Sequence, residues 1–143
     1  MRVEVAKHVR SPLSGVYAWC TDYRDDDAEI SGVRLRWRRV LRRTADEVEL
    51  EESANLGVAY TGRVLVHLYP PDRWEADLRS TAGSAHTVYR LRPEGDGTLL
   101  TIAIDVRLRW QYRLFALVAR GIVRRRLSRE WDDYVRAIEA EAS

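Results

Sequence analysis

The chain has 143 residues, which is enough for one domain with its own hydrophobic core and too few for two. Hydrophobic residues make up 45% and charged residues 32% of it, a balance that excludes an intrinsically disordered chain. The net charge of +2 does not indicate a nucleic-acid partner, because nearly all of the 24 basic residues are arginine, which is typical of a compositional bias. We therefore expect a single domain spanning residues 1–143.

The sequence shows no sign of membrane insertion or export. No apolar run approaches the ~20 residues that a bilayer-spanning helix requires, and charged and apolar residues alternate from Arg2 onward, unlike a signal peptide. We therefore expect a cytoplasmic protein without stable membrane insertion. Cys20 is the single cysteine and has no partner for a disulfide or a thiolate metal site, so we interpret it as a buried structural thiol.

Alternation of apolar and polar residues predicts strands along most of the chain. The first covers Arg2 to Val9, and a short helix follows it, because Ser11 is a typical N-cap and Pro12 a typical first helical residue. The stretch from Arg24 to Glu29, which contains four acidic residues, is expected to form a solvated loop. Six further strands are expected at residues 33–40, 47–54, 58–68, 73–79, 85–92 and 100–110.

The strand at residues 33–40 is rich in arginine. Leu35 and Trp37 alternate with arginines, so the pattern places these two side chains inward and Arg34 and Arg38 outward. The next strand carries alternating glutamates, and we expect cross-strand ion pairs on the outer face. A change of phase at residues 39–40 predicts a bulge.

Residues from Gln111 to Glu141 contain no proline and predict one long helix, about 45 Å in length at ~1.5 Å per residue. Its second half has an ordinary amphipathic pattern. In its first half, apolar residues occupy most of the circumference, so we expect that half to be covered on several sides. These residues are Leu114, Phe115, Leu117, Val118, Ile122 and Val123.

The predicted order is a strand, a short helix, six meandering strands and a long C-terminal helix, which is an α+β architecture. Local features include Ser11-Pro12 before Val16-Tyr17-Ala18-Trp19, and a Gly95-Asp96-Gly97-Thr98 hairpin before an apolar strand. In these features the chain resembles the START-like superfamily, also called SRPBCC. That superfamily includes birch-pollen-type allergens, polyketide cyclases/aromatases, and coenzyme-Q-binding and lipid-transfer proteins.

The resemblance implies the helix-grip fold, in which a curved antiparallel sheet of about seven strands wraps around the long helix. It also implies a cavity between sheet and helix for an apolar or amphipathic small molecule. A shared fold does not fix the function, because the superfamily contains binders, carriers and enzymes.

Several residues are expected to line this cavity. Glu52 is in phase with apolar neighbours, where a carboxylate needs an arginine partner, a rim position or an interior pair with Lys7. The hydroxyls of Tyr60, Thr87 and Tyr89 are candidates to bind a ligand oxygen. The apolar wall is expected to come from Trp37, Trp74, Phe115, Val118 and Ile122.

The chain carries none of the motifs that hold a metal or a common cofactor. Its three histidines fall on different predicted strands without metal-ligand spacing, and there is neither a glycine-rich phosphate loop nor a nucleophile elbow. We therefore predict neither a metal nor a cofactor.

The leading hypothesis is non-covalent binding of a hydrophobic small molecule: a lipid, an isoprenoid or quinone, or a polyketide-like ring. A first alternative is an enzyme of the polyketide cyclase/dehydratase type that uses Glu52, Tyr60 or Tyr89 for acid–base chemistry. A second is an interaction module that presents the arginine-rich side of residues 120–129, or an exposed apolar patch, to a protein or membrane. Without interleaved aromatic residues that side does not indicate nucleic-acid binding.

Overall fold

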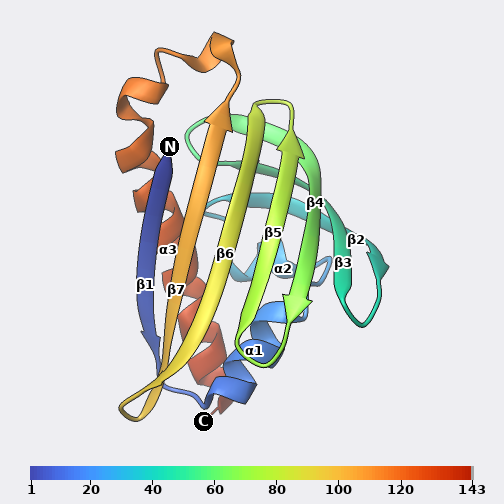
Figure 1. The fold of residues 1–143 in the computed structure, drawn as a ribbon, viewed down its shortest axis with the longest axis vertical. Helices are drawn as coiled ribbons and strands as arrows, with labels where there is room; N and C mark the ends of the chain where they lie inside the picture. The colour runs from blue at the N-terminus through green and yellow to red at the C-terminus, as the bar shows by residue number, and fades with distance from the viewer. Residues whose placement is uncertain (143) are drawn as a thin grey trace.

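The computed structural model describes residues 1–142. Seven strands, three α-helices and one short 3₁₀ helix follow one another in those residues (Figure 1). The order is β1 (Arg2–Val9), α1 (Leu13–Thr21), α2 (Asp27–Ile30), β2 (Leu35–Arg43), β3 (Glu47–Asn55), β4 (Ala59–Tyr69), β5 (Arg73–Ser80), β6 (Gly83–Glu94), β7 (Gly97–Leu108), η1 (Trp110–Tyr112) and α3 (Ala116–Ala142).

The strands form one antiparallel sheet in the order β1-β7-β6-β5-β4-β3-β2. Strands β2 to β7 are an uninterrupted meander, and β1 completes the sheet by pairing with β7, where Val5 lies opposite Ile102. The sheet curves, with α3 along one face and α1 at one end (Figure 1). This is the predicted α+β architecture, with the short helix after the first strand and the long helix at the C-terminus.

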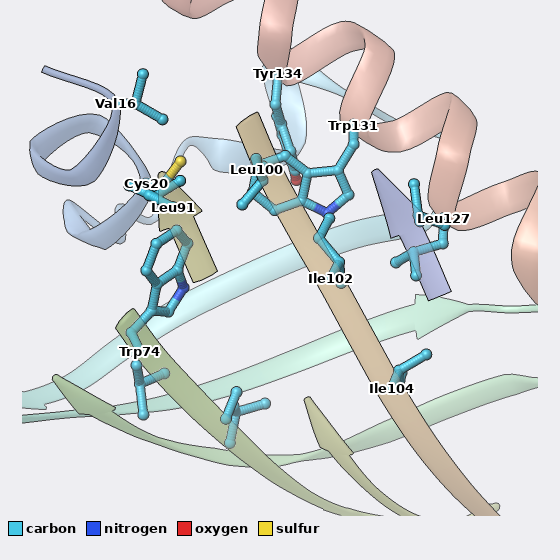
Figure 2. Close-up of a cluster of buried hydrophobic side chains, with 14 of the residues drawn as sticks. Val16, Cys20, Trp74, Leu91, Leu100, Ile102, Ile104, Leu127, Trp131 and Tyr134 are labelled. Atoms are coloured by element: carbon cyan, nitrogen blue, oxygen red, sulfur yellow. The ribbon is translucent and has the colours of Figure 1, made fainter. Parts of the chain in front are cut away.

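The core lies between the inner face of the sheet and the second half of α3 (Figure 2). Alternate residues of β7 point inward, and Ile102 and Ile104 meet Leu127 and Trp131 from two successive turns of the helix. Burial of each such side chain contributes about 1.5–3 kcal/mol. The apolar faces predicted for β7 and for the second half of α3 therefore pack together in one core.

Local differences from the prediction occur at the first two helices. Pro12 is the N-cap of α1 with an extended backbone (φ −60°, ψ 148°), the helix begins at Leu13, and no side chain caps it. The prediction with Ser11 as the N-cap was therefore wrong by one residue. Part of the predicted acidic loop forms α2, whose Asp27 is buried.

The start of α3 differs more. Trp110 was expected in the last strand and residues 111–115 in the helix, but a 3₁₀ turn intervenes and α3 begins at Ala116. The prediction that this half is covered was wrong, because Leu114, Leu117 and Val118 are 76%, 83% and 60% exposed. The segment lies at one end of the sheet (Figure 1), with Phe115 toward the strands and Leu114, Leu117 and Val118 exposed to solvent.

Candidate functional site

Two adjoining hollows lie between the sheet and the second half of α3. The inner cavity, about 60 Å³, has a floor of inward-facing strand residues that includes Leu50, Tyr60 and Thr87. The outer pocket, about 160 Å³, lies beside α1, α2 and the second half of α3, and its lining includes the exposed residues Arg24 and Glu141. Five residues line both hollows and therefore form the partition between them: Tyr23, Arg34, Arg38, Tyr89 and Glu130.

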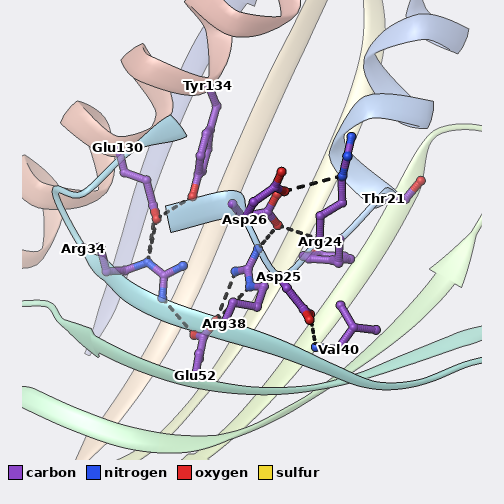
Figure 3. A network of polar contacts seen from close by, with 12 residues as sticks. Thr21, Arg24, Asp25, Asp26, Arg34, Arg38, Val40, Glu52, Glu130 and Tyr134 are labelled. Carbon is purple, nitrogen blue, oxygen red and sulfur yellow. Dashed lines mark hydrogen bonds and ion pairs between the residues drawn. The ribbon is translucent and has the colours of Figure 1, made fainter. Parts of the chain in front are cut away.

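The guanidinium of Arg34 is the centre of this partition (Figure 3). Its Nε donates to both carboxylate oxygens of Glu130, at 3.0 and 2.9 Å. Its Nη1 donates to Oε1 of Glu52 and to the hydroxyl oxygen of Tyr60, both at 2.9 Å. Glu130 and Glu52 are 1% and 3% exposed, so one arginine holds two buried carboxylates from opposite walls.

Arg38 extends the network toward the helices. Its Nη2 donates to Oε2 of Glu52 at 3.0 Å, and its Nη1 donates to Oδ2 of Asp27 at 2.5 Å. On the other side, the hydroxyl of Tyr134 donates to Oε2 of Glu130 at 3.1 Å. Ion pairs therefore connect β3 and the start of β2 to α2 and α3 (Figure 3).

An irregularity in β2 brings Arg38 inside. Leu35 lies opposite Ala54, but Trp37 lies opposite Ser53, so Arg36 is an extra residue at this point of the ladder. The extra residue reverses the alternation: Trp37 turns outward and is 38% exposed, while the side chain of Arg38 is only 8% exposed. The predictions that Trp37 lines the cavity and that Arg38 lies on the outer face were therefore wrong.

Arg34 was also expected on the outer face and is inside. It precedes the first residue of β2, where the alternation of the strand does not yet apply. Glu52 faces inward as predicted, and its partners are the two arginines. The alternative partner, Lys7, instead donates to Asp132 at 2.6 Å and to Ser128 at 2.8 Å, both on α3.

Arg34, Arg38 and Glu52 keep their charges in the folded protein. Burial opposes the positive charge of Arg34 and Arg38, but the neighbouring carboxylates outweigh this effect, so the pKa of each arginine is raised. Burial alone would raise the pKa of Glu52, yet the two arginines outweigh it and the pKa is lowered. Glu52 is therefore an ionised carboxylate that accepts hydrogen bonds and has no proton to donate.

Aromatic rings form the wall next to the partition. Tyr89 stacks on Trp74 with ring centroids 4.8 Å apart and an interplanar angle of 5°. The ring centroid of Trp131 lies 5.8 Å from that of Tyr89, with the two rings tilted by 52°. Burial raises the pKa of Tyr89, so its hydroxyl stays protonated and is a hydrogen-bond donor. Within residues 1–142 neither this hydroxyl nor that of Thr87, two residues earlier on β6, has a hydrogen-bond partner. Two unused donors therefore face the hollows from one strand.

The structure brings together four of the residues singled out from the sequence: Glu52, Tyr60, Thr87 and Tyr89 all line the inner cavity. The others lie elsewhere. Trp74 is fully buried behind Tyr89. Phe115 lines a third, end pocket of about 40 Å³ together with Val123 and Leu108, under the first turns of α3.

Val118 and Ile122 line none of these three hollows. Val118 is 60% exposed, and Ile122 packs beside Phe115 over Gly57, where an added Cβ would lie 2.8 Å from Ile122. Both were expected to wall the cavity because the first half of α3 was expected to lie over the sheet. Phe115 and Val123 are the side chains of this half that face the strands, so Val118 and Ile122 lie outside the cavity.

Sequence reasoning missed the inward role of Arg34, Arg38 and Glu130. The signal for Glu130 was available: it follows Leu127 by three residues and precedes Tyr134 by four, which places it on the buried stripe of α3. A carboxylate on such a stripe requires a buried cation. The arginines before and within β2 were candidates to supply it.

No protein-family model matches this sequence, and no curated protein sequence matches it either. Solved structures do match. The TTHA0849 protein of Thermus thermophilus superposes with a TM-score of 0.85 at 13% identity, over 100% of both chains. The Zhui aromatase/cyclase of Streptomyces sp. R1128 gives 0.76 at 17% identity, over 99% of this chain and 93% of the other.

A START superfamily protein of Mycobacterium smegmatis gives a TM-score of 0.70 at 15% identity, over 99% of this chain and 96% of the other. This chain has the START-like helix-grip fold. At these identities the similarity concerns the fold alone. It gives no information on whether the other proteins share the network of Arg34 and Arg38. In residues 1–142 of this helix-grip domain, no helix has the length and apolarity to cross a membrane, and no three His, Cys, Asp or Glu side chains gather as a metal site.

Proposed function

We propose that this protein binds a small oxygenated ring compound without covalent chemistry, between the sheet and α3. The observation that carries the proposal is the pair of unpartnered hydroxyls, Tyr89 and Thr87, beside a stack of aromatic rings. Tyr89 and Trp131, which line the outer pocket, offer apolar ring surface to the body of a ligand, and Trp74 supports Tyr89 from behind. The hydroxyls offer hydrogen bonds to a carbonyl or hydroxyl oxygen on it.

The size of the site favours a ring over a lipid chain. A cavity of about 150 Å³ holds benzene, so the outer pocket of about 160 Å³ accommodates roughly one aromatic ring. Sites for larger ligands measure about 300–1,000 Å³. Among the ligand classes that the sequence suggested, a quinone head or a polyketide-like ring therefore fits better than an acyl chain.

Similarity to proteins named as aromatase/cyclases supports the same choice. These include Zhui, of which this chain covers 93%, and the di-domain proteins StfQ and BexL, of which it covers 50% each. Their names refer to chemistry on ring-forming substrates. We carry over to this chain the class of ligand and leave out the reaction.

A pair of matched ligands tests the proposal. Acetophenone and ethylbenzene have nearly the same size and differ in a carbonyl oxygen. We expect acetophenone to bind more tightly by calorimetry, and Tyr89→Phe to reduce its affinity about fivefold, since a hydrogen bond contributes ~1 kcal/mol. Tyr69→Phe is the control, because Tyr69 is 43% exposed and lies outside both hollows. Equal affinities for the two compounds in the wild-type protein would contradict the role of the hydroxyls.

Native mass spectrometry of the purified protein provides a test that does not depend on chosen ligands. A co-purifying ring compound, released by denaturation and identified, would support the proposal. A co-purifying acyl lipid would show instead that the ligand class is wrong.

A second candidate function is enzymatic, and it rests on the convergence of Glu52, Tyr60 and Tyr89 on the inner cavity. In a cyclase or dehydratase reaction, the ionised carboxylate would take a proton from the carbon next to a ligand carbonyl. The electron pair of the broken C–H bond would form an enolate, whose oxygen accepts hydrogen bonds from the tyrosines.

Deuterium exchange separates the enzyme from the binder. An enzyme of this type would accelerate exchange of the methyl protons of acetophenone in D₂O, and Glu52→Gln would abolish the acceleration. A binder leaves the exchange rate at its buffer value while acetophenone still binds. The occupation of both Glu52 oxygens by arginines makes binding our leading proposal.

A further inference from the structure

The first turns of α3 and the turn before them carry an apolar surface that nothing in the described chain covers. We call it the apolar tip and define it by Trp110, Leu114, Leu117 and Val118. These side chains are 75%, 76%, 83% and 60% exposed, whereas the other exposed large hydrophobic residues reach only 37% to 43%. Apolar residues gathered in this way on a soluble chain mark an interaction site.

The sequence on both sides of the apolar tip is basic. Between Asp105 and Glu130 the chain has no acidic residue and eight arginines, at positions 107, 109, 113, 120, 124, 125, 126 and 129. Leu117, Arg120 and Arg124 follow at steps of three and four, so they lie along one side of α3. In residues 1–142 no ion pair neutralises Arg113, Arg120 or Arg124.

We propose that the apolar tip docks on the surface of an anionic lipid bilayer. Burial of leucine and valine side chains at the boundary between headgroups and acyl chains is favourable, and tryptophan is enriched at that depth. The guanidinium groups beside them match lipid phosphates. Binding to an anionic bilayer requires apolar and cationic side chains side by side, and the apolar tip and its neighbouring arginines provide both. This docking does not depend on which ligand the cavity binds.

The charge pattern argues against a second copy of this chain as the occupant. A two-fold contact through the apolar tip would place the same surface on both partners. Arg113, Arg120 and Arg124 of one copy would then face the arginines of the other, with no acidic residue between positions 105 and 130 to pair with them. An anionic bilayer covers the apolar side chains and neutralises the arginines together.

The shape of the molecule is compatible with this orientation. The beginning of α3 lies at one end of the sheet, next to the N-terminus of β1 (Figure 1). The tip is therefore free to meet a flat surface without contact by the loops at the opposite end. The end pocket under Phe115 lies at the same end and would be brought close to the bilayer.

Flotation with lipid vesicles tests the proposal. Vesicles of phosphatidylcholine with about one third phosphatidylglycerol are compared with pure phosphatidylcholine, at about 20 and 500 mM NaCl, because salt screens charges over a Debye length. We expect binding to the anionic vesicles at low salt, at least tenfold weaker binding at high salt, and no binding to the neutral vesicles.

Matched variants locate the surface. We expect the double variant Trp110→Ser, Leu117→Ser to lose at least tenfold in affinity for anionic vesicles. Trp37→Ser, Leu41→Ser is the control, since these residues are 38% and 40% exposed on β2 and lie outside the apolar tip. Circular dichroism of each variant confirms that it remains folded.

Three results would overturn the proposal. The first is absence of binding to anionic vesicles at low salt, and the second is equal loss of binding in the control variant. The third is a stable wild-type dimer by light scattering that Leu117→Ser converts to a monomer, because a second copy would then be the occupant. None of these results bears on acetophenone binding, so failure here and failure of the proposed function are distinguishable.

Discussion

Replacement of Glu130 by leucine should destabilise the fold strongly. The carboxylate is 1% exposed, accepts two hydrogen bonds from Arg34 and accepts a third from Tyr134. Removal of one partner of a buried ion pair costs about 3–5 kcal/mol, because the remaining charge stays buried. Arg34 keeps its contact with Glu52, so we expect a loss near 3 kcal/mol in the free energy of unfolding.

A double-mutant cycle measured by urea unfolding tests the origin of this loss. Arg34→Met with Glu130→Leu removes both charges and leaves Glu52 paired with Arg38. We expect the double variant to be more stable than Glu130→Leu alone, because it no longer buries a guanidinium that has lost one of its two carboxylate partners. A loss below about 1 kcal/mol for Glu130→Leu, or strict additivity in the cycle, would refute the reasoning.

Further predictions concern sites outside the network. The pKa of His8 is raised, first by its hydrogen bond with Glu94 and then by a second carboxylate. His8 therefore stabilises the fold below its unfolded pKa of about 6.5, and the contribution is lost as pH rises through the higher folded value. The difference in urea midpoint between wild type and His8→Gln should be larger at pH 5.5 than at pH 8.5. Cys20 is buried and burial raises its pKa, so Ellman's reagent should modify it only after unfolding in guanidinium. Gly62→Val should lower the free energy of unfolding by about 1–3 kcal/mol, because a Cβ at this position would lie 2.4 Å from a β5 carbonyl oxygen. A Cβ at Gly121 would meet no atom within 4 Å, so the Gly121→Ala variant should be at least as stable as the wild type.

Most of the fold could be predicted because each strand and helix repeats its pattern over many residues. Leu100, Ile102 and Ile104 alternate without interruption in β7, and the structure buries all three. The same regularity placed Glu52 inside. Where period and register are undisturbed, the sequence pattern alone determines which face of an element is buried.

The part of the site that could not be predicted depends on β2. Alternation reports the pleat of a strand, but it does not show where an extra residue enters the ladder. A bulge was predicted at residues 39–40, and the ladder does shift between Val40 and Arg42. A second shift, between Leu35 and Trp37, had no signal of its own, and it is the one that turns Arg38 inward.

The start of α3 could not be predicted for a different reason. An apolar face predicts burial only where a second surface is present to cover it. β7 ends at Leu108, and of the large apolar residues 114–118 Phe115 faces the strands while Leu114, Leu117 and Val118 are exposed. The sequence shows that this part of the helix is apolar around most of its circumference. It does not show which surface, if any, covers these side chains.

The partition between the two hollows bears on the kind of ligand that the proposed site would retain. A compound that reaches from the outer pocket into the inner cavity must displace a contact among Arg34, Glu130 and Glu52, because these side chains lie between the hollows. A hydrocarbon would offer no replacement for the displaced hydrogen bond, so the buried guanidinium would lose one of its partners. A ligand oxygen that accepts a hydrogen bond from the guanidinium exchanges one partner for another, which costs far less. For this reason the network favours ligands with a carbonyl, phenolate or carboxylate oxygen over hydrocarbons of the same size.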